Sequence, residues 1–317
     1  MVYVGFGFLM TFLRAHSWTS IAFNWITAAW AWLCAGLWIG LWERVWHNHF
    51  EHHPIELTIR SMIDADFGAA TVLITMGALL GKVNAYQLLF VATVETCFAA
   101  LNYTLTYTVY GASDIGGSMW IHCFGGLFGL MCSWAYKNPK ESEQKLAMSS
   151  YHSNVFGFIG TLFLWLYWPS FNGALQVGNN KQRAIINTTY SLVCSSFSGL
   201  VMSMVLHKGK MNIEQILNAT LAGGVMMGSA ADMIVSPFVS MCIGFAAGIV
   251  STAGFHFFEH IIFKYLKLHD TCGVAYLHFI PGLIGGFIGC LVAGATPETK
   301  YGADIGSVYP MMGGDYD

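Results

Sequence analysis

The chain has 317 residues, of which 55% are hydrophobic and only 10% are charged, against roughly 25% charged residues in an ordinary soluble domain. Its formal net charge is −3 and its basic residues are scattered, so no basic stripe follows a nucleic-acid backbone. The sequence also contains no P-loop pattern. Composition and charge therefore exclude nucleic acid as an expected partner and indicate a lipid bilayer as the solvent.

Apolar runs of about 20 residues, the length that crosses a bilayer, recur along the whole chain and not only at its start, where a signal peptide would lie. In chain order they predict ten transmembrane helices at about 1–14, 17–42, 60–81, 86–110, 114–136, 154–174, 184–206, 213–231, 235–259 and 270–295. We therefore expect an all-α polytopic membrane protein with a single transmembrane domain over 1–317. The first span is short and the 296–317 tail is polar and glycine-rich, so we expect the chain to be a fragment.

The connections between the spans, assigned alternately to two sides, carry nine Lys and Arg residues on one side and five on the other. Cytoplasmic connections carry an excess of Lys and Arg, so the side with nine is predicted to be cytoplasmic. Residue 1 and the connection between residues 44 and 60 then lie on the outer side of the membrane.

A sixteen-residue pattern occurs twice, as DIGGSMWIHCFGGLFG at 114–129 and as DTCGVAYLHFIPGLIG at 270–285. Both copies have the spacing D-x2-G-x4-H-x3-G-x2-G, and the matched pairs are Asp114 with Asp270, Gly117 with Gly273, His122 with His278, Gly126 with Gly282 and Gly129 with Gly285. Ionisable residues are rare inside membranes, so the coincidence predicts an internal repeat. Repeat one covers about 1–136 and repeat two about 154–295. Each repeat holds five spans, and because five is odd, the second copy enters the membrane in the opposite orientation.

Inverted repeats build transporters whose site lies near the bilayer midplane, where the two repeats meet. Each histidine follows its aspartate by eight residues, about 12 Å along a helix, so we expect the aspartates at helix starts and the histidines near mid-membrane. The glycines share the histidine face and allow a neighbouring helix to come close. Asp114 and Asp270 are more consistent with helix caps than with partners of the histidines, although their charge could also draw a cation toward a pore mouth.

A single histidine in a membrane is as consistent with a structural hydrogen bond as with function, whereas two symmetry-related histidines favour function. No nucleophile, metal triad or cofactor motif accompanies them, so we expect no enzyme activity, no cofactor and no metal site. The second histidine cluster, WHNHFEHH at 46–53, lacks the HExxH order of a zinc hydrolase. It is predicted to be a polar loop.

Six segments carry a resemblance to a known family: VYVGFGFLMTFL at 2–13, MIDADFGAATVL at 62–73, DIGGSMWIH at 114–122, GTLFLWLYWPSFN at 160–172, NATLAGGV at 218–225 and DTCGVAYLHFIPG at 270–282. They resemble the ammonium transporter and Rhesus glycoprotein superfamily, specifically its Rhesus branch. The resemblance implies the ammonium-transporter fold and a homotrimer with one pore per subunit. The family has a further final core helix, whose absence agrees with the fragment hypothesis, and we expect a multi-pass protein of the plasma membrane.

The resemblance also implies roles for individual residues. His122 and His278 match the paired pore histidines, Phe67 and Phe171 match two phenylalanines stacked over the outer entrance, and Asp114 matches the family's acid at the start of the fifth helix. Asn172, beside Phe171, is expected to line the vestibule. Two positions depart from the family: Tyr103 stands where Rhesus glycoproteins commonly have Glu, which casts doubt on an acidic recruitment site, and Trp120 replaces a usual Thr, from which we expect only a packing change.

The resulting hypothesis is an ammonia channel. Ammonium would be attracted outside the two phenylalanines, lose a proton there and pass the histidines as neutral ammonia, because an isolated charge is costly in a low-dielectric interior. Two alternatives remain from the sequence. A carbon dioxide conduit would use the same pore, and a non-conducting Rhesus-type scaffold subunit would have less reason to keep both histidines.

Overall fold

The structure, a computed structural model, describes residues 1–47, 54–136 and 148–312. Over these ranges the chain is helical apart from its connections and one isolated bridge between Leu13 and Ser149. The α-helices are α1 (Val2–Leu9), α2 (Ser17–His47), α3 (Ile59–Leu79), α4 (Ala85–Thr104), α5 (Phe124–Ala135), α7 (Tyr151–Asn172), α8 (Gly178–Leu206), α9 (Ile213–Met227), α10 (Pro237–Ala253), α11 (Glu259–Leu266), α12 (Ile280–Ala295) and α13 (Ile305–Val308).

Short turns of 3-10 or π-helix extend or interrupt several helices. Those that matter below are η1 (Met10–Phe12), η2 (Leu105–Val109), η3 (Ser118–Cys123), η6 (Gly254–Phe258) and η7 (Ala275–Phe279). Each predicted span coincides with one of these helices or with a helix and its extension, which confirms the all-α fold class. Within the described ranges, six helical segments are long and apolar enough to cross a membrane by length and composition alone. Several boundaries were misplaced: α2 continues to His47, α8 already begins at Gly178, and the helical segment that begins at Pro237 continues through η6 and α11 to Leu266.

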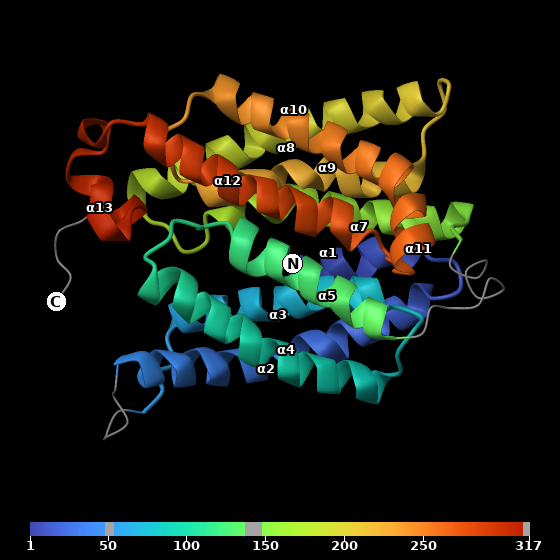
Figure 1. Cartoon of the computed structure of the whole chain (residues 1–317), viewed down its shortest axis with the longest axis horizontal. Coiled ribbons are helices and arrows are strands. Elements are labelled where there is room, and N and C mark those ends of the chain that lie inside the picture. Colours follow the sequence, from blue (N-terminus) through green and yellow to red (C-terminus); the bar gives the residue numbers. More distant parts are fainter. Residues whose placement is uncertain (48–53, 137–147, 313–317) are drawn as a thin grey trace.

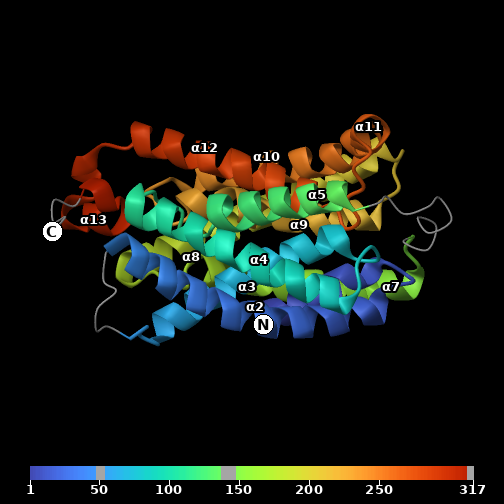
Figure 2. The same ribbon diagram turned by 60° about the horizontal axis from the view of Figure 1, so that its bottom comes forward.

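The helices run along one common direction (Figure 1), and the first and second halves of the chain form two neighbouring groups. Helices α2, α3 and α4 pack together in the first half, and α8, α9 and α10 in the second. The two halves meet at two places: α1 and η1 pack against α7, and η3 and α5 contact η7 and α12. Figure 2 shows the same bundle turned, with α2, α3 and α4 brought forward.

Helix starts are specified locally by capping pairs. In α3, α4 and α7 the side chain of the residue before the helix accepts a hydrogen bond from the backbone N–H of the residue three positions later. The side chain of that later residue in turn accepts a hydrogen bond from the backbone N–H of the capping residue. This reciprocal arrangement satisfies two of the donors that a helix start leaves free. The capping residues are Thr58, Asn84 and Ser150, paired with Ser61, Gln87 and Ser153.

Burial divides the helices into central and peripheral ones. Almost all of α3 from Asp64 onward is buried, and small residues such as Gly68, whose added Cβ would lie 2.6 Å from that of Ala35, allow its neighbours to approach closely. The peripheral helices α2 and α8 expose large apolar side chains, including Trp25, Leu37 and Phe197. An apolar exterior around a core with buried polar groups is the arrangement of a multi-pass membrane protein.

Candidate functional site

The sixteen-residue repeat has the same backbone conformation in both copies. Gly117 and Gly273 have positive φ angles of 69° and 71°, a region that residues with a Cβ rarely adopt. Each glycine follows its aspartate by three residues and begins a π-helical turn, η3 in the first half and η7 in the second. The duplicated glycine is therefore a backbone requirement of the motif.

Both aspartates cap the helix that follows them. The Asp114 carboxylate accepts the N–H groups of Met119 at 2.9 Å and Trp120 at 3.1 Å. Asp270 accepts those of Val274 at 3.0 Å and Ala275 at 2.8 Å. Because the first N–H groups of a helix have no partner inside it, these bonds fix the direction in which each helix enters the bundle, as the sequence predicted.

The two histidines lie on π-helical turns, and here the prediction of continuous α-helices over 114–136 and 270–295 was wrong. His122 belongs to η3 and His278 to η7, and regular α-helix begins only at Phe124 and Ile280. Single π-turns are frequent at functional sites. The wider turn changes the angular position of each imidazole relative to the α-helical spacing assumed from the sequence.

His122 and His278 are 1% and 3% exposed, and their Nδ1 atoms are 3.1 Å apart. The rings are nearly parallel, with centroids 5.1 Å apart and an interplanar angle of 16°. One Nδ1 must donate and the other accept, so the two neutral rings take complementary tautomers. The Nε2 atom of His122 is buried without a hydrogen-bond partner in the described part of the chain and is available to a small polar molecule.

Glycines bring the two motif helices together around this pair. A Cβ added at Gly126 would lie 2.8 Å from the backbone nitrogen of Phe279, and one at Gly282 would lie 2.8 Å from that of Cys123. Both distances are too short for a real side chain. The repeat glycines therefore allow the close crossing that brings the imidazoles into contact.

An outer cavity of about 220 Å³ ends at His122. Phe67 from α3 and Phe171 from α7 pack together in its wall with ring centroids 4.6 Å apart, and Phe171 lies 6.1 Å from the His122 ring. Asp66 also lines this cavity, and its carboxylate accepts a 2.5 Å hydrogen bond from the Tyr3 hydroxyl. A carboxyl group thus lies in the wall of a cavity that is otherwise lined mainly by aromatic and aliphatic side chains.

A second cavity, of about 20 Å³, ends at His278. Its wall is almost entirely apolar and includes Leu73, Ile74 and Leu277, with Asn218 as a polar member. Phe6 from α1 lines both cavities and stacks on His278 at 6.0 Å. The smaller cavity has room for roughly one molecule the size of water. The histidine pair thus separates an outer cavity from a narrow apolar one.

Residues 1–313 match the family model described as Ammonium Transporter Family. The chain belongs to this family. It is 42% identical over 315 residues to "Ammonium transporter Rh type B" of Sus scrofa and 42% identical over 317 residues to the Oryzias latipes protein of the same name. These alignments cover 98% of the chain in both cases, and 68% and 67% of the two relatives.

The solved structure "Nitrosomonas europaea Rh50 and mechanism of conduction by Rhesus protein family of channels" matches with a TM-score of 0.83 at 32% identity, covering 99% of this chain and 82% of that one. Mep2 of Saccharomyces cerevisiae matches with a TM-score of 0.75 at 16% identity over 97% of this chain and 76% of that one, which shows the common fold. Together these matches place the chain in the Rhesus branch of the family, as the motifs indicated.

Two of the residues expected in the pore of this Rhesus-type chain lie elsewhere. Asp114 is 1% exposed, and its carboxylate also accepts a 2.5 Å hydrogen bond from the Ser229 hydroxyl, so the capping bonds and this one occupy it. Asn172 does not line the outer cavity. Its amide donates instead to Thr188 and Gly224, which joins α7 to α8 and α9. Neither residue lines the outer cavity, and the Oδ1 atom of Asn172 has no hydrogen-bond partner among the described residues.

Two residues that line the outer cavity were missed from the sequence. Asp66 directly precedes Phe67 in the DADF segment, so adjacency to a motif residue was an available signal. Trp168 stacks on His122 with ring centroids 5.6 Å apart, and its Nε1 atom has no partner among the described residues. A tryptophan in an apolar helix carries no sequence signal of this kind.

The two family departures form one aromatic cluster behind Phe67. Trp120 lies 6.3 Å from Phe67 and 5.1 Å from Tyr103, ring centroid to ring centroid. Tyr107, whose hydroxyl donates to the Asp114 carbonyl, completes the cluster. Trp120 thus packs against the rear of a cavity phenylalanine, in line with the expected packing change.

Metal binding finds no support in the described ranges, where no group of three His, Cys, Asp or Glu side chains is placed to bind an ion. Most of the histidine-rich segment, residues 48–53, lies outside the described residues.

Proposed function

We propose that this chain conducts ammonia across a membrane, taking it up from ammonium at the outer cavity and passing it between His122 and His278. The observation that carries the proposal is the buried imidazole pair, with one cavity ending at each ring. The family membership and the names of the Rh type B relatives support the same substrate.

The outer cavity supplies the first step. The Asp66 carboxylate attracts the ammonium ion, and the faces of Phe67 and Phe171 favour a cation that has lost part of its water shell. Inward of this point the wall offers aromatic and aliphatic carbon, which cannot solvate a charge. The ion therefore releases its proton on the outer side of His122.

The histidine pair then guides a neutral molecule. With one Nδ1 protonated and the other not, one ring presents an Nε2 lone pair and the other an Nε2–H group. Ammonia both donates and accepts hydrogen bonds, so as it moves it can replace a hydrogen bond to one imidazole ring by a hydrogen bond to the other. The unpartnered Nε2 atom of His122 is the place where this exchange begins.

The inner cavity acts as a filter by size and polarity. A volume of about 20 Å³ lined by Leu73, Ile74 and Leu277 accepts roughly one small molecule and no hydration shell. Moving an ion into such a site is costly, whereas ammonia is uncharged. Selectivity against sodium, potassium and ammonium ions follows from the same wall.

We further propose that the chain works as a homotrimer in the plasma membrane. The homotrimer and the location rest on the Rhesus resemblance. Each subunit would contain its own pore, as the same resemblance implies.

The test is ammonia flux into proteoliposomes, followed by stopped-flow measurement of internal pH. We expect His122→Ala together with His278→Ala to lower the protein-dependent flux at least roughly tenfold, the effect of losing about 1.4 kcal/mol of stabilisation along the path. His152→Ala, at an exposed position in the first turn of α7, is the matched control and should conduct normally. Undiminished flux in the double variant at equal reconstitution would overturn the proposal.

A further inference from the structure

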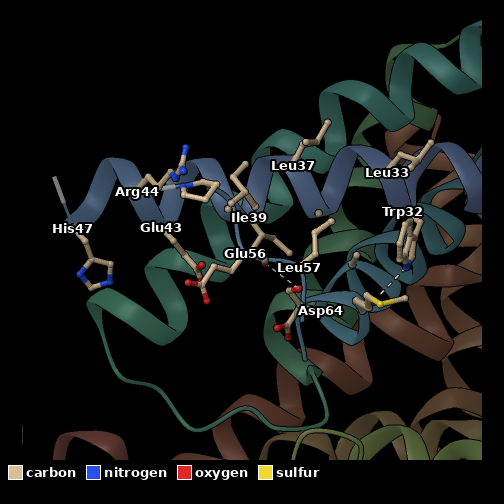
Figure 3. Close-up of a pocket in the computed structure, with 17 residues that line it drawn as sticks. Trp32, Leu33, Leu37, Ile39, Glu43, Arg44, His47, Glu56, Leu57 and Asp64 are labelled. Carbon is tan, nitrogen blue, oxygen red and sulfur yellow. Dashed lines mark hydrogen bonds between the residues drawn. The ribbon is translucent and has the colours of Figure 1, made fainter. Parts of the chain in front are cut away.

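A second large cavity, between α2 and the start of α3, lies away from the histidine pair. It has a volume of about 680 Å³, within the usual range for small-molecule sites. It is enclosed by the second half of α2, the chain from Pro54 to Leu57 and the start of α3 (Figure 3). No described residue lines both this cavity and the outer pore cavity.

Asp64 and Asp66 show how the two cavities are separated. They are two positions apart on α3, and Asp64 lines the peripheral cavity whereas Asp66 lines the outer pore cavity. Residues two apart on a helix point about 200° apart. A ligand of the peripheral cavity would therefore meet α3 on the face opposite to the pore.

The polar end of the cavity is charged. Glu43, Glu56 and Asp64 line it, together with Arg44 and His47. Arg60, at the start of α3, interacts electrostatically with both Glu43 and Asp64, so three carboxyl groups lie near two arginines and a histidine. Figure 3 shows the carboxyl groups of Glu43 and Asp64 facing the same open region. Carboxylates that share a cavity repel each other, and a cation between them would stabilise both.

Asp64 shows that an acceptor in this cavity is left without a donor. The residue is 5% exposed, and its Oδ1 atom has no hydrogen-bond partner within the described chain. The Tyr103 hydroxyl interacts with the same carboxyl group, so only part of its hydrogen-bonding capacity is used. A buried acceptor without a donor is costly, and a ligand with an N–H group would supply the donor.

The other end of the cavity is apolar and open to the lipid side. Trp32, Leu33 and Leu37 line it, and Leu33 and Leu37 are 54% and 64% exposed on the outside of α2. Asp64 lies five residues after the first residue of α3, about 7.5 Å along the helix. Glu43 and Asp64 therefore lie nearer the helix ends than Leu33 and Leu37, which is the order of headgroup and acyl chain in a bilayer lipid.

We propose that this cavity binds an outer-leaflet phospholipid with a primary ammonium headgroup, such as phosphatidylethanolamine. The ammonium group lies between Asp64 and Glu43 and donates to Asp64 Oδ1. The lipid phosphate meets Arg44, and the upper acyl chain lies along Leu33 and Leu37. A choline headgroup fits less well because it has no N–H group to donate.

The test is native mass spectrometry of the full chain, purified and exchanged into lipids of matched acyl chains. The headgroups form a series from phosphatidylethanolamine through its mono- and dimethylated forms to phosphatidylcholine. We expect affinity to fall along the series, and Asp64→Asn to lower phosphatidylethanolamine affinity roughly tenfold, the effect of one charge-assisted hydrogen bond. Asp66→Asn removes the same charge on the opposite face of α3 and should bind this lipid like the unchanged chain.

A second variant covers the case in which Asp64→Asn does not fold. Gly36 lines the cavity, and a Cβ added there makes only an ordinary 3.7 Å contact with Ala65. Gly36→Leu therefore fills the cavity without removing a charge, and it too should lose phosphatidylethanolamine. Equal binding of the ethanolamine and choline lipids, or unchanged binding in both variants, would overturn the proposal.

Competition with free ammonium and with ethanolamine shows whether the cavity binds a lipid or a small cation. If either displaces phosphatidylethanolamine at millimolar concentration and itself binds with the same Asp64 dependence, the site belongs to a small cation and the lipid proposal fails. Persistence of the lipid at that concentration supports it. The flux assay is independent of this result, since the two cavities have separate linings.

Discussion

At this site, the hydrogen bonds that a residue makes to its neighbours determine which of its polar atoms can still bind a substrate. The Nδ1 atoms of His122 and His278 are occupied by each other, which directs any further hydrogen bonding to Nε2. The Asp114 carboxylate is occupied by backbone and side-chain donors. The Asn172 amide nitrogen donates to Thr188 and Gly224 behind the cavity wall, and its Oδ1 atom has no partner among the described residues. Asp66 has one hydroxyl donor and lines the outer cavity, which makes it the acid available to ammonium.

Asp66→Asn is therefore expected to weaken ammonium recruitment and leave the narrow passage intact. The half-saturating concentration of methylammonium should rise up to roughly tenfold at low ionic strength, and the difference should shrink in high salt, where exposed charges are screened. Uptake kinetics at two ionic strengths measure this. The same half-saturation as in the unchanged chain at low salt would show that Asp66 takes no part.

At the scale of helices and turns, the histidine contact is a consequence of how closely η3 and η7 can approach. The duplicated Asp, Gly and π-turn arrangement aims each histidine inward, and Gly126 and Gly282 remove the side chains that would separate the turns. Lys82, in the connection between α3 and α4, adds a cross-link. Its amine donates to Ala78 at 2.7 Å, to the Ser133 hydroxyl at 2.6 Å and to the His269 carbonyl.

Gly282→Ala should both destabilise the protein and reduce flux. The new methyl group would lie 2.8 Å from the Cys123 nitrogen and closer still to the Ser118 carbonyl, and overpacking of this kind costs about 1–3 kcal/mol. Thermal unfolding in detergent and the flux assay report the two effects. Gly294→Ala on the same helix has nothing within 4 Å and is the control; equal behaviour of the two variants would contradict the close crossing.

We expect the burial of Lys82 to make the free energy of unfolding rise with pH. Burial lowers the pKa of Lys82 from 10.5 to about 8, against the opposing effect of Asp270. Between these values the unfolded chain binds a proton that the folded chain does not, so the free energy of unfolding increases with pH across this window. Lys82→Met should lack this increment when unfolding is compared at about pH 7 and about pH 10. An identical pH dependence in the variant would show that another group is responsible.

At the scale of the whole molecule, helices from both halves of the chain line the outer and inner cavities. The peripheral cavity between α2 and α3 lies on the outside of the same bundle, so lipid contact and conduction use different faces of one scaffold.

The proposed homotrimer can be tested together with pore independence. Native mass spectrometry should find three chains per particle. In mixed particles made from unchanged subunits and subunits with His122→Ala and His278→Ala, flux should fall in proportion to the fraction of altered subunits. A fall with the third power of the unchanged fraction would mean instead that conduction needs all three subunits together.

The sequence by itself determined the membrane class, the ten helical segments, the repeat and the histidine pair. These follow from local chemistry: apolar length, rare ionisable residues in lipid, and a glycine at each position with a positive φ angle. The single domain over 1–317 and its repeat boundaries at about 1–136 and 154–295 stay predictions.

Only the tertiary structure decided which polar groups remain available for function. The π-turns depend on packing between η3 and η7, and the engagement of Asn172 depends on Thr188 and Gly224, which are distant in sequence. For the same reason Asp66 rather than Asp64 lines the pore cavity, since the neighbours of α3 decide which face meets which cavity. Hydrogen bonds between distant segments cannot be predicted from the spacing of residues in the sequence. Spacing determines on which side of its own helix a residue lies, but not which residues of neighbouring helices face it.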